Sequence, residues 1–147
     1  MQHTRRLIYE SISLLGPVMD LLPGGCHVSK APDNTPLPYL VLDVGGLTGI
    51  EDDTSNIHVE TRPVTFSIFT LDPDLGAMIL DLLEAAFDLE LDPPPMVGGD
   101  FAGTRFMAIY KEADDLLLDP DRTSEGDEVW MVLGRFNFVI QRDSVYV

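Results

Sequence analysis

Apolar residues at helical spacing open the chain. Across residues 4–15, Ile8, Ile12 and Leu15 recur at intervals of four and three, which places them on one face of a helix. Pro17 cannot continue that helix, because it lacks a backbone donor and its ring clashes with the preceding turn. The pattern therefore predicts a helix that ends near Leu15, followed by a short second turn that begins at Pro17.

A second amphipathic helix is predicted after Asp72. Asp72 suits the N-cap, because its carboxylate can accept a hydrogen bond from the first turn, and Pro73 suits the first helical position. The apolar stripe runs to about Asp88 and comprises Leu75, Met78, Ile79, Leu82, Leu83, Ala86 and Phe87.

Strands are predicted where apolar residues alternate or run together. Residues 26–30 read as a short edge strand, residues 39–44 are nearly all apolar, and residues 59–71 alternate towards their end. Pro63 indicates that the first half of this last strand runs along an edge or leaves the sheet. The chain closes with a predicted hairpin of two strands, at 104–118 and 129–142, joined by an acidic turn at 119–128.

The order of these elements predicts an α+β fold in one domain over residues 1–147. We expect a mainly antiparallel sheet of four to five strands with two helices packed on one face. No apolar run reaches the ~18 to 20 residues of a membrane span, so no membrane association is expected. The predicted core packs Ile8, Ile12, Leu15, Leu82 and Phe87 against Val41, Phe66, Trp130, Phe136 and Phe138.

The segment 45–58 is predicted to be a flexible loop. It places fourteen mostly polar residues between two of the best strands. A loop of this length is uncommon inside a compact domain unless it is functional or disordered. The alternative is a tolerated surface insertion, because a long loop lowers the stability of a fold only slightly more than a short one does.

Charge is the unusual feature of the composition. Nine Lys and Arg against 25 Asp and Glu give a net charge of −16. Free nucleic-acid binding is therefore not expected, because phosphate contacts need clustered Lys and Arg. The acidity serves either solubility or a surface that DNA must pass without binding. Cys26, the single cysteine, excludes an intramolecular disulfide and indicates a reducing compartment.

Candidate chemistry is sparse. Cys26 beside His27 resembles a nucleophile–base pair, but adjacent strand residues point to opposite faces, so a buried free thiol is expected. Residues 121–132 resemble a calcium loop with Gly126 in the sixth position, yet Val132 stands where the bidentate Glu is needed. The three histidines lack metal-ligand spacing. We expect no enzyme activity, no cofactor and no metal.

Four segments together resemble the tail terminator family of long-tailed bacteriophages, also called tail completion or head–tail joining proteins. They are the opening "RLIYESISLL", the strand entry "PLPYLVLDV", the strand "VTFSIFTLD" running into the helix "PDLGAMILDLLEAAF", and the closing "GRFNFVI". The resemblance covers Leu7 to Arg142. The turn at 119–128 is longer and more acidic than the family pattern, and the connector "DPPPMVGG" is richer in proline.

The resemblance implies a structural protein that forms a six-membered ring. Such a ring caps the tail tube, stops its polymerisation and joins it to the head. The implied partners are other copies of the chain, the tail tube protein and the head-side connector or stopper protein, while DNA passes through the central channel without specific binding. The implied location is the neck of the virion, and the host cytoplasm during assembly.

Within such a ring, two sets of residues become candidates for function. The loop is a candidate for docking to a neighbour or to the tube through Thr48, Ile50, Glu51, Asp52, Asp53, Thr54 and Asn56. The channel lining is expected to come either from Glu51, Asp52 and Asp53 or from Asp119, Asp121, Glu125, Asp127 and Glu128. The sequence leaves both choices open.

Two other classes compete with this interpretation. An acidic DNA mimic that inhibits a nucleic-acid-binding protein would carry carboxylates spaced like phosphates on one face; here the acids are interleaved with loops and buried strands. A small-ligand α+β domain or enzyme would need a polar pocket, which no motif marks.

Overall fold

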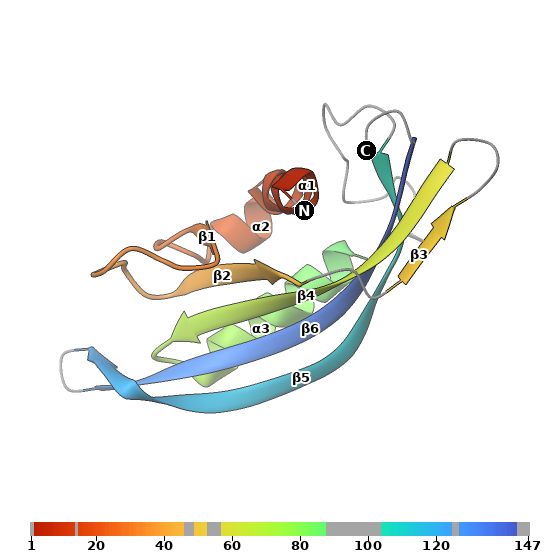
Figure 1. The fold of residues 1–147 in the computed structure, drawn as a ribbon. Helices are drawn as coiled ribbons and strands as arrows, with labels where there is room; N and C mark the ends of the chain where they lie inside the picture. Colours follow the sequence, from red (N-terminus) through yellow and green to blue (C-terminus); the bar gives the residue numbers. More distant parts are fainter. Residues whose placement is uncertain are drawn as a thin grey trace.

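A twisted six-stranded sheet carries the fold (Figure 1). The computed structural model describes residues 2–13, 15–45, 49–52, 57–87, 104–124 and 127–143. The elements follow in the order α1 (Gln2–Ser13), α2 (Gly16–Met19), β1 (Cys26–Val28), β2 (Tyr39–Val44), β3 (Gly49–Asp52), β4 (Ile57–Thr70), α3 (Pro73–Ala86), β5 (Thr104–Ser124) and β6 (Asp127–Asp143).

The strands lie in the order β1-β2-β4-β6-β5, and β3 pairs with β4 beside β2. β1 runs parallel to β2, and every other described pair is antiparallel. The predicted α+β class and the mainly antiparallel sheet are therefore confirmed. β1 is an edge strand as predicted, and β5 forms the opposite edge.

The helices cover one face of the sheet. α1 packs on β1 and β2, and α3 packs on β4 and β6. The α3 helix begins as predicted, with the Asp72 Oδ1 accepting from the Asp74 amide at 3.0 Å and Pro73 next in line. It approaches β6 closely, because a Cβ on Gly134 would meet the Leu80 Cδ1 at 2.4 Å. The absence of a side chain at Gly134 is what allows the helix to come this close to the strand.

Aromatic rings fill the space between the sheet and α3. The Phe66 ring lies 5.4 Å from the rings of Phe87 and Phe136, and the Phe87 ring lies 5.3 Å from that of Phe138. Leu82 is only partly buried at the margin of this core, and Trp130 is half-buried. The predicted core residues that the structure buries here are Ile8, Ile12, Leu15, Phe66, Phe87, Phe136 and Phe138.

Val41 corrects the core prediction. It is buried, but on the sheet face opposite the helices, in a small cluster with Tyr39 and Ala31. Its neighbours Leu40 and Leu42 face the helices instead. The prediction was wrong because a continuous apolar run such as 39–44 gives no sign of which residues face which layer.

The predicted loop at 45–58 contains a strand. β3 pairs antiparallel with β4, with Glu51 opposite Val59 and Asp52 opposite His58. The loop prediction is therefore wrong for Gly49–Asp52 and for the start of β4. A four-residue polar strand has no apolar periodicity, and its stability comes from hydrogen bonds to β4 rather than from its own sequence.

On one side of β4, the neighbouring strand changes from β2 to β3 at Pro63. The Gly45 amide donates to the Pro63 carbonyl at 2.7 Å, directly after β2 ends and before β3 begins. Because proline has no amide to return this bond, the ladder is interrupted there. β4 nevertheless stays paired with β6 through the whole range from Ile57 to Thr70. The expectation that its first half leaves the sheet or forms an edge is wrong.

The predicted turn at 119–128 is largely strand. β5 continues to Ser124, and Thr123 pairs with Glu128. The register jumps between Leu118 and Thr123, so residues 119–122 lie opposite Val129 alone. The acidic segment is therefore an irregular extension of the hairpin, with a bulge where the extra residues are accommodated.

Candidate assembly surfaces

The two acidic sets predicted from the sequence lie at opposite ends of the sheet (Figure 1). Glu51 is opposite Val59, which pairs with Gln141 near the end of β6. Glu128 lies at the beginning of β6. Thirteen residues of extended strand span roughly 40 Å. The structure does not bring the sets together, so one narrow site on a subunit cannot use both.

The structure describes only part of each set. Ile50, Glu51 and Asp52 have their backbone on β3, and Asp119, Asp121 and Asp127 have theirs on the β5–β6 hairpin. The Glu128 side chain is exposed. The remaining predicted residues lie outside the described ones: Thr48, Asp53, Thr54, Asn56 and Glu125.

Sequence reasoning missed an exposed apolar stretch on the edge strand β5. Leu116, Leu117 and Leu118 are 49%, 39% and 42% exposed. Successive strand residues point to opposite faces, so leucines are exposed on both sides of the sheet. All side chains from Glu112 to Leu118 are exposed. The three consecutive leucines between acidic residues could have predicted this exposure. Side chains alternate between the two faces of a strand, so at least one of the three must lie on a face that no helix covers.

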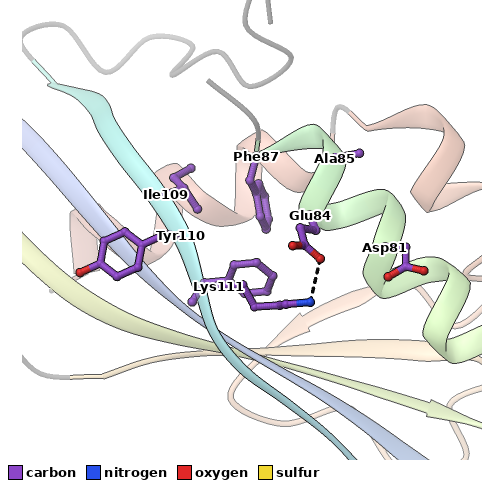
Figure 2. A pocket seen from close by; sticks show the side chains of 8 residues that line it. Asp81, Glu84, Ala85, Phe87, Ile109, Tyr110 and Lys111 are labelled. Carbon is purple, nitrogen blue, oxygen red and sulfur yellow. Dashed lines mark hydrogen bonds and ion pairs between the residues drawn. The ribbon is translucent and has the colours of Figure 1, made fainter. Parts of the chain in front are cut away.

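An open groove runs between α3 and β5 (Figure 2). Its apolar lining includes the side chains of Phe87, Ile109 and Phe136. At its rim the Lys111 Nζ lies 2.9 Å from the Glu84 Oε2 and 3.1 Å from the Asp114 Oδ2. The hydrogen bond to Glu84, and then that to Asp114, raise the pKa of Lys111. Lys111 is thus held as a cation, which suits a structural ion pair and not a nucleophile.

Cys26 and His27 diverge as predicted. Cys26 lies in the core under the helices, and burial raises the pKa of its thiol to about 12. The His27 ring lies towards the other face, 6.2 Å from the Tyr39 ring, and its Nε2 is 2.7 Å from the Gly24 carbonyl oxygen. The expectation of a buried free thiol is confirmed. A thiol with so high a pKa is inert at neutral pH.

A buried ion pair lies on β4 where the sequence predicted an interruption. The Arg62 Nε and Nη2 each lie 3.3 Å from a carboxylate oxygen of Glu60, and both residues are buried. The Arg62 Nη1 also donates to the Gly45 carbonyl at 3.4 Å. That carbonyl lies opposite Pro63, which has no amide to offer it. Glu60 and Arg62 stand at the same two-residue spacing as the buried Val64 and Phe66. This spacing could have predicted that their side chains are buried on the same face, but the break expected at Pro63 obscured it.

No group of three or more His, Cys, Asp or Glu within the described residues could hold a metal ion. No helix in the described part of the chain is long and apolar enough to cross a membrane.

Comparison with known proteins identifies a related fold. Neither a protein-family model nor a curated protein matches the sequence. Among solved structures, the chain is similar to a chain in the virion of a native gene transfer agent particle. The similarity covers 90% of this chain and 91% of that chain, with a TM-score of 0.57 and 13% sequence identity. At this identity the likeness shows a shared fold: the chain folds like a component of that virion.

Proposed function

We propose that the chain is a structural virion protein, and more specifically a tail terminator that forms a ring at the neck of a phage-like particle. The observation that carries the proposal is the fold, which is shared over nearly the whole chain with a component of a gene transfer agent virion. The order of sequence motifs from Leu7 to Arg142 supports the finer assignment. In this proposal the protein caps the tail tube, stops its growth and binds the head-side connector.

The character of the described surfaces supports a structural role over a catalytic one. The cysteine is buried and protonated, and the groove lysine is held by two carboxylates. The other prominent features are large surfaces. The two ends of the sheet project beyond the part that the helices cover, and the edge strand β5 exposes apolar side chains (Figure 1). Such features suit contacts with other subunits.

The separation of the acidic sets gives the proposal a geometry. In a ring around DNA, only one end of each subunit's sheet can face the channel. We therefore assign one acidic set to the channel and the other to a surface away from it, where a tube or connector subunit can bind. Neutralising each set separately, Glu51→Gln with Asp52→Asn against Asp127→Asn with Glu128→Gln, should impair different steps: the passage of DNA through the channel in one case and joining in the other.

The first test is the assembly state of the purified protein. Analytical ultracentrifugation and negative-stain imaging should reveal a ring of about six copies. Six copies at −16 each carry roughly −96, so ring formation should strengthen as monovalent or divalent salt increases. A phosphate-binding protein responds to salt in the opposite direction. Addition of the rings to growing tail tubes should stop elongation.

The acidic DNA mimic is the alternative that the same experiment separates. A mimic would remain a monomer and form a one-to-one complex with a basic, nucleic-acid-binding protein that weakens as salt rises. A monomer at every salt concentration, with no effect on tube growth, would overturn the terminator proposal.

A further inference from the structure

The described sheet has two unlike edges. β5 is a 21-residue strand with no described strand outside it, while β1, at the other edge, has three residues. A long unpaired edge presents backbone amides and carbonyls to any extended segment that can pair with it. Natural proteins usually protect such edges with charges or covering elements. Here the exposed part also carries Leu116, Leu117 and Leu118, which favours a contact over protection.

The charges along this edge limit its partner. Glu112, Asp114 and Asp115 precede the leucines and are exposed. Pairing of β5 with β5 of another copy would place these acids near one another, and like charges opposite each other destabilise a strand pair. Lys111 on the same strand offsets only part of this charge, because it lies 3.1 Å from the Asp114 Oδ2 and leaves Glu112 and Asp115 without a cation of their own among the described residues. A partner edge that brings a further cation is therefore favoured.

The opposite edge of the same sheet offers that cation. Lys30 lies two residues after the end of β1, is exposed, and has no side-chain partner among the described residues. β1 bonds to β2 through Gly25 and Ser29. The direction of the backbone N–H and C=O groups alternates along a strand. The N–H and C=O of Cys26 and the N–H of Val28 therefore point away from β2.

We propose that the β5 edge between Glu112 and Leu118 binds the β1 edge of a second copy of the chain, with Lys30 of that copy facing the acids of β5. The contact joins two different surfaces, so each copy can bind one neighbour at each edge. Head-to-tail contacts of this kind form a ring when the rotation between neighbours closes, as the proposed function requires. This inference rests on the proposed ring function and names the surfaces that build the ring.

Substitution at the edge tests the contact. Leu117→Lys adds a charge and removes exposed apolar surface at the edge. It should lower the association constant measured by analytical ultracentrifugation about tenfold or more, as expected for an interface anchor. Met78→Lys is the matched control, because Met78 is 46% exposed on α3, the helix that packs on the central strands β4 and β6. This control should assemble as the wild type does.

A charge exchange tests the pairing of the two edges. Asp115→Lys and Lys30→Asp should each weaken assembly, and the double variant should recover most of the loss. Hydrogen exchange on the wild type gives a readout without any substitution: amides within Glu112–Leu118 and the amides of Cys26 and Val28 should exchange more slowly in rings than in monomers. Rings that tolerate Leu117→Lys, or that leave these amides unprotected, would overturn this contact alone. A wild type that never assembles would overturn both the contact and the proposed ring.

Discussion

Phe66 and Leu117 are both large apolar residues on neighbouring parts of one sheet, but their surroundings differ completely. Phe66 is fully buried on β4, in contact with the rings of Phe87 and Phe136. Leu117 lies on the β5 edge with 39% of its surface exposed. The helix-covered centre alternates apolar and polar residues, whereas the edge places three leucines in succession. Alternation fits a strand with one covered face, and a succession of leucines leaves apolar surface for another molecule.

This comparison separates folding from assembly. Residues of the centre should determine the free energy of unfolding, and residues of the β5 edge should leave it nearly unchanged while they control association. Large apolar residues therefore stabilise the fold where a helix covers them and are available for association where no helix does.

The largest expected effect is the loss of Phe66. Phe66→Ala should lower the free energy of unfolding by ~3 to 5 kcal/mol, because it removes a buried ring and leaves a cavity. Leu117→Ala, at the edge, should change it by less than about 1 kcal/mol. Urea denaturation of the monomer measures both. Equal losses in the two variants would abolish the distinction between centre and edge.

Arg62→Ala should have a comparable effect within the centre. It removes the guanidinium that lies against the buried Glu60 carboxylate, and breaking a buried ion pair typically destabilises a protein by ~3 to 5 kcal/mol. Replacing both residues by apolar ones, Glu60→Leu with Arg62→Met, should destabilise less than Arg62→Ala does, since no charge remains buried. Denaturation midpoints compare the variants. A loss below about 1 kcal/mol for Arg62→Ala would mean that water reaches this pair.

Close contact between α3 and the sheet predicts an intermediate effect. A Cβ on Gly76 would meet the Val132 Cγ2 at 2.6 Å and the Thr70 Cγ2 at 3.0 Å. Gly76→Ala should therefore destabilise by ~1 to 3 kcal/mol despite the better helix propensity of alanine. Gly16→Ala is the matched helical control, because a Cβ there meets nothing within 4 Å. Thermal unfolding that ranks the two variants the other way would refute the close packing of α3.

The smallest effect concerns Cys26. Burial raises its pKa from 9.0 to about 12, so the folded state holds the thiol proton more tightly than the unfolded state does. This contribution to stability is fully present below pH 9 and is lost as the pH rises towards 12. At pH 8, iodoacetamide should label the folded protein far more slowly than the protein in urea. Rapid labelling of the folded form would show that the thiol is exposed.

The sequence by itself determined the helices, the main strands and their approximate ends. The intervals of Ile8 and Ile12, the Asp72–Pro73 start of α3, and the run Tyr39–Val44 act within a few residues of the chain. Local hydrogen bonds and side-chain direction are enough to define such elements. The divergence of Cys26 and His27 followed for the same reason, because alternation along a strand is a local property.

Only the tertiary structure decided which strands pair and which surfaces stay open. β3 exists because β4 has an unpaired side after β2 ends, and the acidic sets are far apart because β6 places them at opposite ends of one ladder. Val41 faces away from the helices, and Glu60 and Arg62 are buried together, through the register of β4 with its neighbours. Each of these outcomes depends on contacts between residues distant in the chain. A local pattern of apolar and polar residues does not determine such contacts.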